Sequence, residues 1–426
     1  MIKMLSNQKN KFSTIFYFLF IVFIFFTPPF GSYDIIGPQW FLYSLLNVII
    51  LVFIFNELSI DIFYLFFKSP FIKLTILFFI LCIFSLLYAN NKVLVIHDLS
   101  RFGTFFISIL LFFILFKKNM FSIKHIFLLF FFILIIQLFQ SLRPFVSEFL
   151  FYDLDIFNIS EINLSIFKGN AGNKNITAAS IVLSLFVPLY LFSKENYFIK
   201  FLAALLIFFQ ILVIFFLSAR SSFLSLFLSI SLFSIYIFYK NKIHLYISLF
   251  IIFFTFSLSY TLSSYILPSN LSVAERSSSI DFSNESSSNR LVLWSNAIDH
   301  ISNHPLVGSG FGNWKVESIK YWGNIGDYYL IPYHAHNDIL ELTTELGIIG
   351  GLSYLLIFIT LFIFHFSNFL KFKSFHNLFL MLFLFSYSID MLLNFPLERP
   401  IMQVPLALFI AYSSYLYLNP TTYEDV

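Results

Sequence analysis

Long apolar runs, separated by short polar turns, recur along almost the whole chain. Most are close to the roughly 20 residues that a helix needs to cross a bilayer, so the pattern predicts an all-α, polytopic transmembrane bundle of about twelve spans. A shorter apolar segment, 57–67, is expected to be re-entrant or interfacial. The expected spans are 12–27, 39–55, 71–89, 102–116, 125–142, 176–193, 198–217, 221–239, 243–262, 338–366, 375–393 and 400–418.

Two polar stretches interrupt this pattern and divide the chain. We expect nine spans in 1–262, where the first long outer loop lies at 143–175. The largest outer loop, 263–337, contains short helices, and 338–426 holds the last three spans. Lys3, Lys9 and Lys11 precede the first apolar run as in a signal peptide, but no small-residue cleavage site follows it, so we interpret this run as an uncleaved span.

Composition supports a membrane protein and excludes several other classes. Only 11% of the 426 residues are charged, against about 25% in soluble domains. The net charge of +3 is too small for a nucleic-acid-binding surface. Cys82 is the only cysteine, so one chain can form neither a disulfide framework nor a cysteine-based metal site.

The basic residues predict the orientation of the bundle. Placing the N-terminus in the cytoplasm makes every inner turn short and lysine-bearing, which agrees with the positive-inside rule, and both termini are then cytoplasmic. The basic residues of these inner turns are all lysines. All six arginines then lie outside. Since arginine adds a planar fork that binds phosphate or carboxylate bidentately, this asymmetry suggests an outer anion site, with a chance distribution as the alternative. The arginines are Arg101, Arg143, Arg220, Arg276, Arg290 and Arg399.

The first outer loop ends in a glycine- and asparagine-rich segment, 168–175, directly before a span. Asn173 and Asn175 suit a tight turn and a helix cap, and we favour this structural role for them. Anion binding by backbone amides at the helix start is the alternative.

The second outer loop contains one clear amphipathic pattern. Apolar residues at 294, 297, 298 and 301 share one helical face, and Pro305 ends the segment. We expect a short helix on the outer membrane interface. Arg290 lies one turn before Trp294, so the apolar face would hold the arginine in place.

The end of this loop carries candidate acid–base chemistry. A helix is expected to begin near Asn337 and to run through the glycine cluster at 347–351 into the tenth span. His336 would lie at its positive end, which disfavours imidazolium and leaves a neutral ring that can accept a proton. His334 is two residues away, and we expect only one of the two histidines to be catalytic. The alternatives are helix capping alone and a zinc site with Asp338, for which no further ligand is apparent.

Four stretches of the sequence resemble the bacterial O-antigen ligase and polymerase family, whose members are polytopic transferases of lipid-linked glycans. The stretches are Gly172-Asn173-Lys174-Asn175, Ser218-Ala219-Arg220-Ser221, the run from Arg290 through Trp294 to Gly310, and His334 to Leu340 with Glu345-Leu346-Gly347.

This resemblance implies transfer of a glycan from an undecaprenyl-diphosphate carrier on the periplasmic face of the inner membrane, without metal, nucleotide or other cofactor. Arg220 and Arg290 match the two arginines that bind the diphosphate, and His336 matches the proposed base. The partners would be this donor, an acceptor on lipid A core or another glycan, and the bilayer. The remaining residues expected to contact substrate are Asn173, Asn175, Trp294, His334 and Asn337.

The sequence leaves two questions open: the acceptor of the transfer, and the functional class of the protein. The sequence does not separate a ligase, whose acceptor is lipid A core, from a polymerase, whose acceptor is another lipid-linked glycan. A transporter or flippase is the main alternative of another class, but transporters usually carry ionisable residues near the membrane midplane, and here they gather outside. A structural assembly factor would leave the arginines and histidines unexplained.

Overall fold

The computed structural model describes residues 17–27, 30–31, 34–151, 164–194, 196–240, 242–266, 290–324 and 333–419. Within these residues the chain is helical and has no strand. Ten of the described helices are long and apolar enough to cross a membrane. The predicted all-α, multi-pass architecture is therefore confirmed, while twelve spans stay a prediction, because the first expected span begins outside the described residues.

The membrane helices follow the predicted order along the chain. After the apolar helical turns at 17–25 come α2 (Ile36–Ile54), α3 (Ile60–Lys68), α4 (Pro70–Phe84), α5 (Lys92–Lys117), α6 (Ile123–Phe151), α7 (Lys174–Leu183), α8 (Phe186–Phe192), α9 (Tyr197–Leu217), α10 (Arg220–Lys240), α11 (Lys242–Ile266), α15 (Asp338–Phe372), α16 (Phe375–Leu393) and α17 (Pro400–Leu418).

Two of these spans depart from a single straight helix. The segment expected at 176–193 is divided into α7 and α8 after Leu183, close to Pro188, whose missing N–H weakens the helical ladder. In α15 the helix is interrupted at Gly347, which has φ +74° and ψ 178°. These conformations belong to the backbone and are invisible in a hydropathy pattern.

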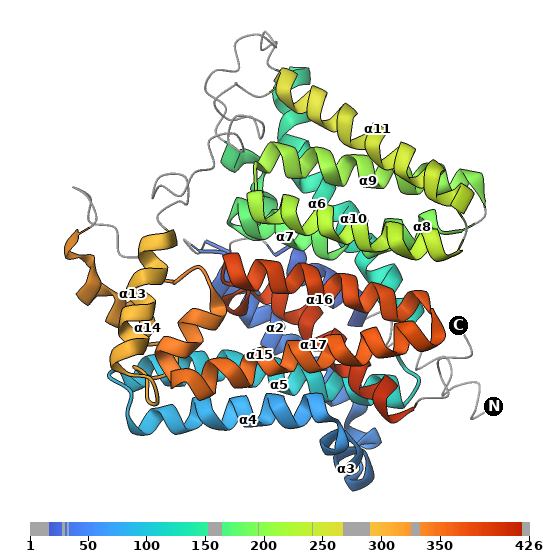
Figure 1. Cartoon of the computed structure of the whole chain (residues 1–426). Coiled ribbons are helices and arrows are strands. Elements are labelled where there is room, and N and C mark those ends of the chain that lie inside the picture. The colour runs from blue at the N-terminus through green and yellow to red at the C-terminus, as the bar shows by residue number, and fades with distance from the viewer. Residues whose placement is uncertain are drawn as a thin grey trace.

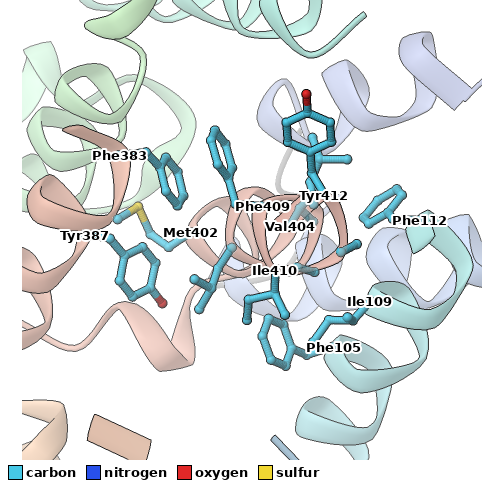
Figure 2. Packing of buried hydrophobic residues seen from close by; sticks show 14 of the residues in the cluster. Phe105, Ile109, Phe112, Phe383, Tyr387, Met402, Val404, Phe409, Ile410 and Tyr412 are labelled. Carbon is cyan, nitrogen blue, oxygen red and sulfur yellow. The ribbon is translucent and has the colours of Figure 1, made fainter. Parts of the chain in front are cut away.

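The core surrounds α17, which is buried on nearly every side. Figure 2 shows α17 between Phe105, Ile109 and Phe112 of α5 and the aromatic side chains of α16. Phe383 and Phe409 stack with ring centroids 3.7 Å apart. A helix that is apolar all round belongs in such a position.

The short helices α13 (Arg290–Asn303) and α14 (Trp314–Glu317) lie together at one end of the bundle (Figure 1). The loop between them is tied to the interruption of α15: Ser309 N donates to Thr344 O at 3.0 Å, and Ile348 N donates to Pro305 O at 2.9 Å. A side chain on Gly347 would lie 2.3 Å from the Leu306 carbonyl oxygen. Glycine is thus required there for close approach as well as for its positive φ.

Basic residues are distributed unequally between the two ends of the helices. Arg220, Arg290 and Arg399 begin or directly precede α10, α13 and α17, at the end where α13 lies. Lys117 and Lys373 lie at the opposite helix ends. Lys92 and Lys174, which begin α5 and α7, share the end with the arginines, so lysine occurs at both ends. That the arginine end faces outward stays a prediction.

Candidate active site

The candidate site is formed where helix ends from distant parts of the chain converge. Arg290 is the first residue of α13, Arg220 the first of α10, and His336 precedes α15 by two residues. The turn after α16, with Asn394 and Arg399 at its ends, lies among them. Three predicted site residues, Arg220, Arg290 and His336, therefore lie within one charged cluster.

Arg290 is held by an amide at the end of α16. Its Nη2 donates to Asn394 Oδ1 at 3.2 Å. The Nδ2 of Asn394 in turn donates to Asp390 Oδ1 at 2.5 Å and contacts Ser221 Oγ at 3.2 Å. Burial, and then the charge of Arg220, lower the pKa of Arg290. Two guanidinium groups held close together attract a polyanion such as a diphosphate.

His336 has an unusual backbone and a half-buried ring. Its φ is +53°, in the left-handed region that only a few per cent of non-glycine residues occupy. Asn337 caps α15 as predicted, because its Oδ1 accepts from Leu340 N at 3.0 Å. The buried Nδ1 of His336 has no hydrogen-bond partner among the described residues. A substrate hydroxyl is one group that would satisfy it.

The electrostatic surroundings keep His336 neutral. Burial first, and then the charges of Arg290, His334 and Arg399, lower the pKa of His336 to about 4. The sequence predicted a neutral ring from the helix dipole. The protonation state agrees, but the structure points to burial and neighbouring cations as its main causes.

His334 has the opposite electrostatic balance. Burial alone lowers its pKa, but the carboxylate of Glu341 outweighs burial and raises the pKa above its usual value. Its Nδ1 lies 2.9 Å from Glu341 Oε1, while Glu341 Oε2 accepts from Ala335 N at 2.8 Å. His334 is therefore paired with a carboxylate that favours its protonated form, which makes His336 the better candidate for a base.

Both histidine rings contact Phe395, in the turn after α16. His334 stacks on it at 4.3 Å between centroids, and His336 meets it edge-on at 5.0 Å. The guanidinium carbon of Arg399 lies 4.9 Å from the same ring. Phe395 thus packs against both histidines.

Glu341 offers a test of how this segment positions His336. Glu341→Gln removes the ion pair with His334 and weakens the bond to Ala335 N, so the left-handed backbone at His336 should lose support. Since a misplaced catalytic group is costly even over small distances, we expect about tenfold lower kcat with little change in KM. A pH profile shifted by more than one unit would instead mean that Glu341 itself titrates in the reaction.

The other predicted substrate-binding residues have structural contacts. Asn173 Oδ1 accepts from Asn175 N at 2.8 Å and caps α7, as the favoured interpretation predicted. Trp294 Nε1 donates to Ala335 O at 3.1 Å and so supports the histidine segment. Their contact with substrate stays a prediction.

The face that α13 buries differs from the predicted one. Leu293, Ala297 and His300 are buried, whereas Ile298 is 54% exposed. The helix packs against α15 and the residues around Trp314 rather than lying free on an interface, and this packing selects a face rotated from the apolar stripe.

Several site residues were not singled out from the sequence. Asp390, Asn394 and Phe395 lie at the end of an apolar span, where an ionisable residue such as Asp390 is an indication of function. Arg399 was noted only as one of the outer arginines. In the structure it is half-buried, and its Nε is inaccessible and has no hydrogen-bond partner among the described residues.

The turn that carries Arg399 is anchored by neighbouring helices. Arg101 of α5 pairs with Glu398 at 2.5 Å, and Trp40 Nε1 donates to Glu398 O at 3.2 Å. Asp338 belonged to the alternative zinc site of the sequence analysis. In the structure its Oδ2 accepts from Leu397 N at 3.1 Å. In the described part of the chain no three His, Cys, Asp or Glu side chains are grouped as metal ligands.

Parts of this chain are similar to known proteins of one kind. A family model described as O-antigen ligase matches residues 202–355. A Rickettsia felis protein named "Putative polysaccharide ligase" is 37% identical over 76 residues, which are 16% of this chain and 18% of that protein. A Rickettsia bellii protein of the same name is 35% identical over 71 residues, 15% of this chain and 17% of that protein.

The aligned part thus covers less than one fifth of the length of these curated relatives. The family model reaches further and includes Arg220, Arg290 and His336. Residues 202–355 are therefore similar to the O-antigen ligase family, which the motifs of this segment also resemble.

Proposed function

We propose that this protein is an O-antigen ligase-like glycosyltransferase. It moves a glycan from an undecaprenyl-diphosphate carrier to an acceptor hydroxyl on the periplasmic face of the inner membrane. The observation that carries the proposal is a partly buried cluster. In it Arg290 is joined through Asn394 to Ser221, the neighbour of Arg220, and the charge of Arg290 acts on the His336 ring.

The proposed reaction is one inverting displacement. His336 accepts the proton of the acceptor hydroxyl as its oxygen attacks the anomeric carbon. The bond from that carbon to the diphosphate oxygen breaks, and the electron pair leaves with the diphosphate. Arg220 and Arg290 stabilise the charge that develops there, which is most effective where water is scarce. No covalent intermediate, metal or cofactor is needed.

The glycan profile of a deletion strain tests the proposal. We expect the loss of all capped lipopolysaccharide, with carrier-linked polymer accumulating, and restoration by the wild-type gene. Caps of a single repeat would instead indicate a polymerase.

In vitro transfer by the purified protein should survive a chelator, and a zinc-restorable loss would contradict the metal-free mechanism.

The orientation of the bundle is tested by reporter fusions. Fusions after Lys118, Lys242 and Lys373 should report cytoplasm, and a fusion within 277–288 should report periplasm. Short lysine-bearing turns are retained inside by the positive-inside rule. The reverse pattern would place the arginine cluster in the cytoplasm and contradict a periplasmic reaction.

A further inference from the structure

A cavity of about 630 Å³ lies at the end of α16 opposite the candidate site. Lys117 and Lys373 lie at this same end of the bundle, which we call the lysine end. It is formed by α6, α8 and α9 with the first turn of α16, and most of its lining is aliphatic or aromatic. Its volume is in the range of about 300–1,000 Å³ that is typical of ligand pockets. Neither the proposed reaction nor the O-antigen ligase match assigns it a role.

The cavity opens sideways, where the membrane would be. Leu128, Ile135, Leu202 and Leu205 line it and are 40–49% exposed, and all four lie within membrane-spanning helices. On the inner side it is closed by Val187, which is 2% exposed. An apolar hollow open to a bilayer fills with hydrocarbon rather than water.

The depth of the cavity matches one leaflet. Its lining on α6 extends from Ile123 at the helix start to Ile135, a rise of about 18 Å at 1.5 Å per residue. Half of a hydrocarbon core of about 30 Å is about 15 Å. A single lipid of the lysine-side leaflet would therefore place its chain along the cavity and its head at the helix ends.

The polar end of the cavity owes its positive charge to two lysines, Lys124 and Lys194. Lys124 and His376 line it, and Tyr190, which also lines it, has the Lys194 ammonium 4.1 Å from its ring centroid. Lys194 is also within electrostatic reach of His376. None of the described lining residues is a carboxylate. This arrangement is complementary to a phosphate-bearing head group.

We propose that this cavity is a binding site for one anionic phospholipid of the lysine-side leaflet, with its acyl chain between α6 and α9 and its phosphate at Lys124 and Lys194. The bound lipid would fill the gap between these helices. The site is separate from the transfer reaction, so either assignment can fail without the other.

Native mass spectrometry of the delipidated full-length protein tests this site, with dioleoyl phosphatidylglycerol as the probe and phosphatidylcholine as its zwitterionic counterpart. We expect one phosphatidylglycerol to be retained in preference to phosphatidylcholine. Lys124→Gln should weaken that retention about fivefold, the effect of one lysine beside an anionic lipid surface. Lys371→Gln, at the same end but outside the cavity, is the matched control and should change nothing.

A second pair of variants tests the acyl chain. Leu206→Trp fills the cavity and should reduce retention of both lipids, whereas Leu224→Trp, on the exposed face of α10, should not. Equal retention of the two lipids that is insensitive to Lys124→Gln would overturn the proposal, because it describes only the general lipid annulus. Displacement of phosphatidylglycerol by equimolar undecaprenyl phosphate would also overturn it. His336→Ala should leave lipid retention unchanged.

Discussion

Replacing His336 by alanine should reduce turnover by roughly 10²–10⁴-fold, the usual contribution of a positioned general base. The ring is half-buried, its pKa is lowered to about 4, and its Nδ1 has no partner among the described residues, so it is available to accept a proton. Donor binding should persist, because the arginines remain. The measurements are in vitro transfer at saturating donor and a separate donor-binding assay.

His334→Ala is the matched control, because both rings contact Phe395 but only His334 is paired with Glu341. It should lose much less activity. Equal losses in the two variants, or normal turnover by His336→Ala, would remove His336 from the mechanism and leave electrostatic stabilisation of the diphosphate as the main source of catalysis.

The pH dependence adds an independent measurement of the same assignment. Because the pKa of His336 is lowered to about 4, the ring is neutral and can act as a base over the whole neutral range. The kcat/KM of the wild-type enzyme should therefore stay level from pH 7 to about pH 5 and fall as His336 becomes protonated near pH 4. A fall centred near pH 6.5 would indicate an unperturbed histidine as the base.

Arg290→Lys should reduce transfer by about 10²-fold while the protein still inserts, a loss like that from removing one preorganised donor at a developing charge. Lysine keeps the positive charge but loses the planar fork, which here reaches Asn394 at 3.2 Å. Asn394 in turn contacts Ser221, next to Arg220, so the change also loosens the link between the two arginines. Transfer and donor affinity of the purified variant are the measurements.

Arg143→Lys makes the same chemical change at an exposed arginine of α6 and should leave transfer unaltered. Arg220→Lys should resemble Arg290→Lys. Near-normal transfer by both Arg220→Lys and Arg290→Lys would exclude bidentate binding of the diphosphate, because both variants retain the charge.

The features predicted correctly from the sequence are local ones. The apolar runs located the membrane helices, because a span needs about 20 apolar residues in a row whatever packs against it. Asn337 identified the start of α15, and Pro305 the end of the helix that begins at Arg290, because capping and chain termination depend on neighbouring residues.

Other features were decided only by the tertiary structure, because they depend on residues that are distant along the chain. The contact of Arg290 with Asn394 joins residues 104 positions apart, and the low pKa of His336 comes from burial and from Arg290. Packing against α15 selected the buried face of α13. The sequence by itself therefore determined which residues end helices and carry charge, and only the packing of the helices decided which ends meet, because burial and through-space electrostatics depend on that packing.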